Sequence, residues 1–558
     1  SAALIGGCDA GCGDGSAGGA DPEPTADLET HTIIYGGDVT LGRRINEALW
    51  DAGARGRIFG DVEPLLREAD LALVNAEGVI TLGGRFNNKG EPRPYLFRAH
   101  PSVIEVLSRA GIDLVTVGNN HAVDYGPEAL TEMLDRLSLA GIDTFGGGHD
   151  AADARRPAYR RLGDTVVALV GADFTVSARY RATKRRAGIL FYDAFRDGSH
   201  EEDIVADLKQ IHDEARRHAQ VVLLSPHWGD NMVDEPAPHL RSLARRLIEV
   251  GYDGILGHSA HVFQGVELID GKPVIYDAGN LVADFGGGGR VHQALAWELE
   301  ITRAGVTRIA GYPLQLKRNR TDLATGKLRD GILESLSAMS LELGARLAIE
   351  DGVARLECNP GGVRGPAKAA DPPVRPRVTS IRLAPDDTLI DALPARAIPL
   401  EARFEGGVRL LGYELLLSEL PTPKAGQVVV AYFTADEPLK ESYHVTLEGR
   451  RSVDGKPGGR SSEAHFPGDW LLPTTEWVPG RIVRDWTLLR LVFDASGTVD
   501  FHLGLTLGGR PVAVAGPDGR IDGNMIHLGR AAFRRGAPGV FAVLDRYRKR
   551  PEQGDAGP

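Results

Sequence analysis

Seven polar side chains that can bind a metal follow short apolar segments in the first half of the chain. They are Asp38, Glu77, Asn120, His121, His227, His258 and His261. Two carboxylates, an amide and four imidazoles form a set of oxygen and nitrogen donors that suits Mn, Fe or Zn better than metals that prefer thiolates. Two such ions about 4 Å apart would polarise a substrate and generate hydroxide from water. The residue types therefore indicate a site for two divalent metal ions and hydrolytic chemistry.

Each of these residues, taken singly, also has a simpler structural role. A carboxylate after a strand usually belongs to a turn or a cap, and Asn120–His121 would suit a helix cap. His227 would suit a hydrogen-bonded core histidine, while His258 and His261 would share one face of a turn. Ligand-type residues after five separate apolar segments favour the metal site over these alternatives.

The apolar segments themselves predict the strands of a sheet. They cover residues 32–37, 71–75, 113–117, 166–170, 221–224 and 254–256. Helical stretches between them open with proline and are followed by glycine, at 101–110, 127–140 and 236–250, and a long helix is predicted over 327–349. Alternation of strands and helices is typical of an α/β domain. Because ligands bind at the carboxyl ends of strands in such sheets, we expect the seven side chains to share one crevice.

The chain changes character after a Gly- and Pro-rich segment at residues 361–373, which predicts a linker. Short β-rich segments divided by Gly and Pro then predict an antiparallel β-sandwich. We expect an anchor and tether over residues 1–30, a metal-site domain over 31–358, a linker over 359–376, a β-sandwich over 377–540 and a tail over 541–558. Trp470 and Trp477 are interpreted as core or turn residues, with stacking on sugars as the alternative.

A series of short motifs resembles the CapA family. The motifs read GDVTLGR, VNAEGVIT, GNNHAVDYG, HWG, GHSAHVFQG and YDAGN, and they begin at residues 37, 74, 118, 227, 257 and 276. CapA proteins are linked to poly-γ-glutamate capsule synthesis, and their domain is similar to calcineurin-like metallophosphoesterases. The resemblance spans residues 31–345 and implies a four-layer α/β/β/α sandwich with the site at one end, followed here by the C-terminal all-β sandwich.

The same resemblance implies a role for each site residue. Asp38 and His261 would bind one metal, Glu77 would bridge, Asn120, His227 and His258 would bind the second metal, His121 would donate a proton to the leaving group, and Arg43 would clamp an anionic oxygen of the substrate. A near-neutral imidazole suits proton donation.

Three positions depart from the superfamily pattern. Thr40 stands where the first motif has a histidine, Glu77 stands where the second has an aspartate, and the last motif spaces its histidines at i and i+3 rather than i and i+2. The family resemblance as a whole implies a protein with a metal-dependent phosphoesterase-type site that acts in the synthesis, anchoring or hydrolysis of an anionic capsule polymer such as poly-γ-glutamate. The alternative is a non-catalytic polymer-binding or scaffold protein for an envelope synthase.

The first thirty residues predict a membrane anchor. Ile5-Gly-Gly-Cys8 resembles a bacterial lipobox in which Cys8 carries the lipid, with an ordinary thiol as the alternative. Residues 9–30 hold six acidic and no basic residues among many Gly, Ala and Pro, which is typical of a flexible tether. We expect a lipoprotein of the bacterial cell envelope that is held to the membrane by its lipid and faces outside the cytoplasm.

The net charge disfavours a nucleic-acid partner. The chain has 64 basic and 76 acidic residues, a formal charge of −12, whereas proteins that bind nucleic acid usually present a basic face. Six of the excess acidic residues lie in the tether, so the rest of the chain is only mildly acidic. The expected partners are instead an anionic envelope polymer or components of a capsule synthase.

Overall fold

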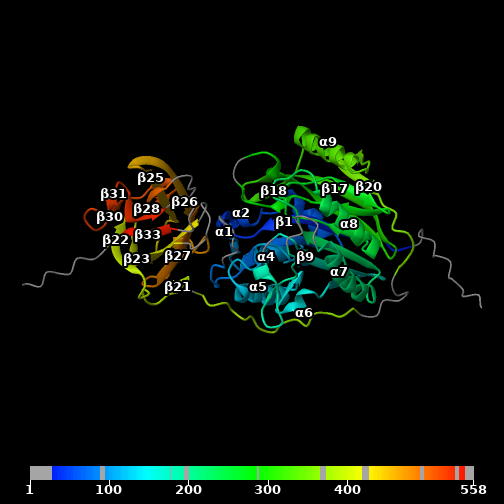
Figure 1. Ribbon diagram of the computed structural model, residues 1–558, viewed down its shortest axis with the longest axis horizontal. Coiled ribbons are helices and arrows are strands. Elements are labelled where there is room, and N and C mark those ends of the chain that lie inside the picture. Colours follow the sequence, from blue (N-terminus) through cyan, green and yellow to red (C-terminus); the bar gives the residue numbers. More distant parts are fainter. Residues whose placement is uncertain are drawn as a thin grey trace, which may run out of the picture.

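A computed structural model gives the architecture of two domains that lie side by side (Figure 1). The structure describes residues 28–87, 95–175, 178–193, 200–285, 288–364, 372–386, 388–417, 426–490, 496–533 and 540–546. Cys8 and most of the expected tether lie outside these residues. No helix within the described ranges is both long enough and apolar enough to cross a membrane.

The first domain contains a ten-stranded mixed sheet. Its main path runs β19 (Ala348–Glu350), β20 (Val353–Glu357), β17 (Gly305–Lys317), β16 (Gln293–Thr302), β1 (His31–Thr40), β2 (Leu71–Glu77), β5 (Leu114–Thr116) and β6 (Asp143–Phe145), with β15 (Asn280–Val282) on β1 and β18 (Arg320–Leu323) on β17. The half from β1 to β6 is parallel, and the half from β16 to β19 is antiparallel. The predicted strands at 32–37, 71–75 and 113–117 are β1, β2 and β5.

A second sheet of six strands belongs to the same domain. Its order is β13 (Val266–Ile269), β14 (Lys272–Ile275), β12 (Gly254–Leu256), β11 (Val221–His227), β9 (Thr165–Asp173) and β8 (Ala158–Leu162). The four inner strands are parallel, and the two edge strands are antiparallel to their neighbours. The predicted strands at 166–170, 221–224 and 254–256 are β9, β11 and β12.

Alternating side chains divide this domain into four layers. On β1, Tyr35 faces the second sheet and packs in one cluster with Leu169 of β9 and Leu223 of β11. The neighbouring Ile34 faces the other way, toward α1 (Arg44–Trp50), α3 (Glu63–Glu68), α4 (Val103–Arg109) and α5 (Pro127–Ala140). The outer face of the second sheet packs on α7 (Glu201–Arg216) and α8 (Pro238–Val250). The α/β/β/α order that the family resemblance implied is therefore confirmed.

The sequence predicts both ends of α5 correctly but not the end of the last helix. Pro127 opens α5, and Gly141 ends it in the left-handed conformation that glycine adopts most easily. The helix expected over 327–349 is α9 (Gly326–Glu342), which ends seven residues earlier than predicted. Gly344 has a φ of 91°, which stops the helix, and residues 348–350 instead pair with β20 as β19. Pairing with a nearby strand therefore outweighs the helical pattern of this segment.

The second domain is an antiparallel β-sandwich, as predicted. One sheet has the order β21 (Leu389–Ile390), β27 (Ile482–Arg490), β24 (Gly426–Ala435), β23 (Val408–Leu417), β22 (Ile398–Phe404) and β30 (Val514–Ala515). The other has β26 (Lys456–His465), β25 (His444–Val453), β28 (Gly497–Leu507), β32 (Met525–Phe533) and β31 (Ile521–Asp522), with β29 (Arg510–Pro511) on β28 and β33 (Val540–Arg546) on β32. The last strand extends past the boundary expected at residue 540. Trp470 and Trp477 are 8% and 5% exposed, which fits core residues rather than a sugar-stacking surface.

The segment between the domains lies along the first domain, beneath α5 and α6 (Ala151–Ala154) in Figure 1. Arg375 donates to the carbonyl oxygen of Asp153 at 2.8 Å. The backbone N–H of Arg382 donates to the carboxylate of Asp135 at 3.0 Å. His149 lies between the same two carboxylates, with Nε2 2.9 Å from Asp135 and Nδ1 3.1 Å from Asp153. These contacts attach the segment to the domain that carries the metal-ligand residues.

The His149 cluster predicts a pH-dependent contribution to stability. The hydrogen bond with Asp153, with help from Asp135 and against the effect of burial, raises the pKa of His149 above 6.5. Because the folded-state pKa is the higher one, the stabilisation is fully present below about pH 6.5 and is lost as the pH rises through the folded-state pKa. We expect His149→Gln to remove about 0.5–1 kcal/mol at pH 6 and less at pH 9. Urea unfolding at both pH values measures this difference, and an equal loss at both would contradict it.

Candidate metal centre

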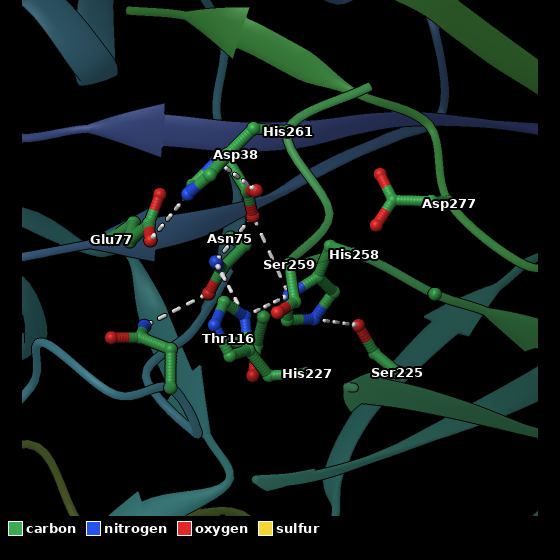
Figure 2. A network of polar contacts seen from close by, with 12 residues as sticks. Asp38, Asn75, Glu77, Thr116, Ser225, His227, His258, Ser259, His261 and Asp277 are labelled. Atoms are coloured by element: carbon green, nitrogen blue, oxygen red, sulfur yellow. Dashed lines mark hydrogen bonds and ion pairs between the residues drawn. The ribbon is translucent and has the colours of Figure 1, made fainter. Parts of the chain in front are cut away.

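Five of the six predicted ligands, all except Asn120, converge between the two sheets, where β1, β2 and β11 end (Figure 2). Asp38 lies at an irregularity of β1, because the register with β2 shifts between Gly36 and Asp38. The Gly37 position has no room for a side chain, since a Cβ there would lie 1.9 Å from the carbonyl oxygen of Gly279. The bulge and the close backbone approach thus direct the Asp38 carboxylate into the site.

One group of ligand atoms consists of Asp38, His227 and His258, all of them buried. His227 and His258 come from neighbouring strand ends that form an isolated parallel bridge. Their Nδ1 atoms lie 2.8 Å apart, and Nδ1 of His258 is 3.5 Å from a carboxylate oxygen of Asp38. Nε2 of His258 lies 3.2 Å from the Ser225 hydroxyl, which fixes the orientation of the ring.

A second group consists of Asp38, Glu77 and His261. Nδ1 of His261 is 3.2 Å from the other carboxylate oxygen of Asp38, and its Nε2 is 3.7 Å from Glu77. His261 has a φ of 61° and Ser259 a φ of 120°, both in the region that non-glycine residues avoid. Backbone strain of this kind is concentrated at functional sites.

Asp277 holds the backbone of the strained loop that carries Ser259 and His261. Its carboxylate accepts hydrogen bonds from the backbone N–H groups of Ala260 and Gly279, both at 2.7 Å. Burial and the nearby charge of Asp38 raise the pKa of Asp277 well above its usual value. Asp277 lies within the YDAGN motif but was not singled out from the sequence, because its role depends on the fold of the neighbouring loop.

The two groups share Asp38, with one carboxylate oxygen facing each. In each group the ligand atoms lie within 4.8 Å of one another. Imidazole nitrogens and carboxylate oxygens are ligands of Zn, Mn and Fe, so the donor set fits two divalent metal ions. The family resemblance implied that Glu77 would bridge; the geometry favours Asp38 in that position. Asn120, expected to bind the second metal, is partly exposed in the loop after β5.

The charges of the ligands also suit cations. Burial alone would raise the pKa of Asp38, but the hydrogen bond with His261 and the surrounding imidazoles hold it below its usual range. Burial lowers the pKa of His258 to about 4, and burial with His258 lowers that of His227, so both rings are neutral ligands at pH 7. Against the effect of burial, Glu77 and Asp38 raise the pKa of His261 to about 10. Metal ligation requires the neutral imidazole, so a bound cation would take the place of that proton.

A pair of amides, Asn75 and Asn119, supports Asp38 and His227 and was not assigned a role from the sequence. Asn75 donates to Asp38 at 2.7 Å, and its side-chain nitrogen lies 3.5 Å from Nδ1 of His227. The side-chain oxygen of Asn75 accepts a hydrogen bond from Asn119 at 2.9 Å. Both amides are buried, so they hold the ligands in place rather than contact solvent. Their only signal in the sequence is their position next to the predicted ligands.

His121 is paired with a carboxylate that sequence reasoning missed. Its Nδ1 lies 2.7 Å from Asp124, and its Nε2 lies 3.8 Å from Glu77 at the second ligand group. Asp124 also accepts hydrogen bonds from the N–H of Phe97 at 2.9 Å and from the hydroxyl of Tyr180 at 3.2 Å. The carboxylate thus fixes the tautomer and direction of the ring, with Nε2 toward the site. The i+3 spacing in His-Ala-Val-Asp is the sequence signal for this pair.

Arg43 lies beside the site on a cluster of aromatic rings. Its guanidinium carbon is 5.8 Å from the centroid of Phe97, and the Phe97 ring is 4.2 Å from that of His121. Nε of Arg43 also lies 3.3 Å from the buried carboxylate of Asp284. The side chain is 18% exposed and therefore retains access to solvent. Its position fits the expected contact with an anionic group, although Asp284 already balances part of its charge.

The segment that carries these ligands matches a family of known proteins. Residues 32–285 match the family described as bacterial capsule synthesis protein PGA_cap. Over these residues the metal-site domain is similar to the CapA family, and we call it the CapA domain. A probable polyglutamine synthesis accessory protein of Mycobacterium tuberculosis is 28% identical over 360 residues, 57% of this chain and 93% of its own length. The PGA biosynthesis protein CapA of Bacillus subtilis is 28% identical over 251 residues, covering 45% of this chain and 62% of its own.

The CapA match includes every predicted ligand but not the whole chain. It ends at residue 285, before β16, and the β-sandwich lies beyond it. The capsule biosynthesis protein CapA of Bacillus anthracis is 25% identical over 258 residues, 46% of this chain and 61% of its own. Among solved structures, the NAD nucleotidase of Haemophilus influenzae covers 56% of this chain and 63% of its own at 15% identity, with a TM-score of 0.26, which is too low to support an argument.

Proposed function

We propose that this protein acts in capsule synthesis at the bacterial cell envelope, and that its CapA domain is a two-metal hydrolase for an anionic polymer such as poly-γ-glutamate. One observation carries the proposal: a buried carboxylate, Asp38, is shared by two groups of His and carboxylate ligands. The names of the relatives, which refer to PGA biosynthesis and polyglutamine synthesis, support the choice of polymer.

The residues divide the chemistry between them. Asp38, His227 and His258 would hold one divalent ion, and Asp38, Glu77 and His261 would hold the other. Asn120 remains a predicted ligand of the ion held by His227 and His258. Bound metals would supply Lewis-acid polarisation of the substrate and would lower the pKa of water. His121, held by Asp124, would deliver a proton from Nε2 to the leaving group. Arg43 would hold an anionic group of the polymer beside the reacting bond.

A non-catalytic role is the second candidate, and two observations favour it. Arg43 is already paired with Asp284, and Thr40 occupies the position of a histidine in the superfamily pattern. A site with these features would hold an anionic polymer, or a partner in a capsule synthase, without cleaving it. The two candidates share the metal ions and differ only in turnover.

Turnover of simple probes separates the two candidates. Protein loaded with Mn²⁺ is incubated with bis(p-nitrophenyl) phosphate and with γ-glutamyl p-nitroanilide, and p-nitrophenol or p-nitroaniline release is recorded. The hydrolase predicts metal-dependent release from one of them, lost after chelation and restored by Mn²⁺. Binding of fluorescent poly-γ-glutamate without release from either probe would support the scaffold instead. A protein that neither binds the polymer nor releases product from a probe would contradict the proposed function.

We also propose that Cys8 carries a lipid that holds the protein on the membrane. The proposal rests on Ile5-Gly-Gly-Cys8 and the acidic segment after it. Cys8→Ala is expected to move the protein from the membrane fraction to the soluble fraction, because the variant lacks the thiol that would carry the lipid anchor. Cys12→Ala is the matched control and should leave the protein on the membrane. Retention of the Cys8 variant on the membrane would refute the anchor.

A further inference from the structure

The β-sandwich contacts the CapA domain at more than one point, including His444, whose Nε2 is 3.4 Å from Glu47. A second contact is made by the carboxylate of Asp469, whose side chain is 18% exposed. Its Oδ2 is 3.2 Å from the guanidinium of Arg98, whose side chain is only 3% exposed. The same oxygen accepts a hydrogen bond from the hydroxyl of Tyr125, and the Arg98 guanidinium stacks 4.4 Å from the Tyr125 ring centroid. Arg98 also donates to the carbonyl oxygen of Gly468 at 3.3 Å. One turn of the sandwich thus contacts two residues of the other domain.

This turn has an unusual backbone. Gly468, Asp469 and Trp470 all have positive φ values, of 69°, 58° and 71°. Such a conformation is costly for side chains other than glycine and persists only where the surroundings enforce it. Here the buried Asp485 enforces it, because its carboxylate accepts from the N–H of Asp469 at 3.1 Å and lies 3.0 Å from His465. The sandwich holds the turn in the shape that presents Asp469.

Each of the two residues that Asp469 contacts is the chain neighbour of a residue that contacts His121. Tyr125 follows Asp124, the carboxylate that holds His121. Arg98 follows Phe97, whose N–H donates to the same Asp124 and whose ring packs on His121. The loop of His121 and the segment of Phe97 and Arg98 are therefore joined twice, once through Asp124 inside the CapA domain and once through Asp469 from the sandwich.

We infer that Asp469 is a positioning residue for His121 and that the β-sandwich is part of the catalytic unit. By fixing Arg98 and Tyr125, Asp469 holds Asp124 and Phe97 where they direct Nε2 of His121 toward the metal-ligand groups. The kinetic consequence rests on the proposed function, whereas the ordering of the His121 loop does not. Loss of the carboxylate leaves the buried Arg98 charge without its ionic partner. The His121 loop then opens more often and the proton donor is less well aligned.

The test replaces Asp469 by asparagine in the full chain, because asparagine tolerates positive φ. Asp500→Asn is the matched control: Asp500 is 16% exposed against 18% for Asp469 and also pairs with an arginine, Arg530, but within the sandwich. Hydrogen exchange followed by mass spectrometry reports the loop without requiring activity. We expect amide exchange in residues 119–126 to be about fivefold faster in Asp469→Asn and unchanged in the control.

Leaving-group dependence is the kinetic readout. A misaligned proton donor matters most for a poor leaving group, so Asp469→Asn should lower kcat about tenfold for diphenyl phosphate and about threefold for bis(p-nitrophenyl) phosphate, at unchanged KM. Tyr125→Phe, which removes a single hydroxyl, should show the same pattern, and the double variant should be no worse than Asp469→Asn alone.

The outcomes are distinct. Unchanged exchange in residues 119–126, or an equal increase throughout the CapA domain, would overturn the positioning role. An equal loss of kcat for both esters would overturn it as well. Faster local exchange together with a wild-type protein that cleaves neither the two esters nor γ-glutamyl p-nitroanilide would uphold the positioning of the loop and reject the proposed hydrolase.

Discussion

Asp38→Asn is expected to abolish metal binding at both sites. Asp38 offers one carboxylate oxygen to the group with His227 and His258 and the other to the group with Glu77 and His261. An asparagine keeps the shape but lacks the charge, and its nitrogen cannot coordinate a cation. Loss of an outer-shell partner alone costs 10–100-fold in metal affinity, so loss of a shared ligand should exceed about 100-fold at each site. Calorimetric titration of chelator-treated protein with Mn²⁺ should give two equivalents for the wild type and none for the variant.

Two further variants distinguish the shared ligand. If Asp38 is shared, Glu77→Gln and His258→Ala should each retain one equivalent of metal, because each residue belongs to one group only. Asp322→Asn, which changes a nearly buried carboxylate paired with Arg320, controls for stability and should retain two. One equivalent in Asp38→Asn and none in Glu77→Gln would show that Glu77 bridges, as the family resemblance implied.

His121→Ala is expected to lower kcat by about 10²–10³-fold while leaving two equivalents of Mn²⁺ bound. His121 is held by Asp124 and directs Nε2 toward Glu77 at 3.8 Å, beside the ligand groups but outside both of them. Its removal should therefore affect proton transfer and not metal content. The rate of diphenyl phosphate hydrolysis, whose poor leaving group depends on the proton donor, and the metal content of the same sample are measured together.

Asp124, whose carboxylate holds His121, allows a graded comparison with His121→Ala. Asp124→Asn keeps a hydrogen-bonding partner for Nδ1 but loses the charge that supports the protonated ring, so its effect should be smaller than that of His121→Ala. Loss of metal in His121→Ala would make His121 a ligand or a support of the ligands. Unchanged kcat with metal retained would remove it from the reaction.

Much of the fold could be predicted because its signals are local. The buried strands of the CapA domain are short apolar runs, and Pro127 and Gly141 mark both ends of α5. The strand ends also indicated the ligands, since parallel strands bring their carboxyl ends to one edge. The end of α9 was wrong because the competing signal, pairing of residues 348–350 with β20, depends on tertiary structure.

The remaining site residues depend on contacts that local sequence does not encode. Asp277 supports a loop that is 17 positions away in the sequence. Asp469 meets Tyr125 across 344 positions and two domains. The sharing of Asp38 follows from the bulge at Gly37 and from which oxygen faces which histidine, and residue types and spacing specify neither.

Two metal ions are expected to share Asp38, and anomalous scattering from crystals grown with Mn²⁺ locates them. The predicted result is two anomalous peaks about 3.5–4 Å apart, one next to His227 and His258 and the other next to Glu77 and His261, with Asp38 contacting both. A single peak, or two peaks that Asp38 does not join, would show that Asp38 is not a shared ligand.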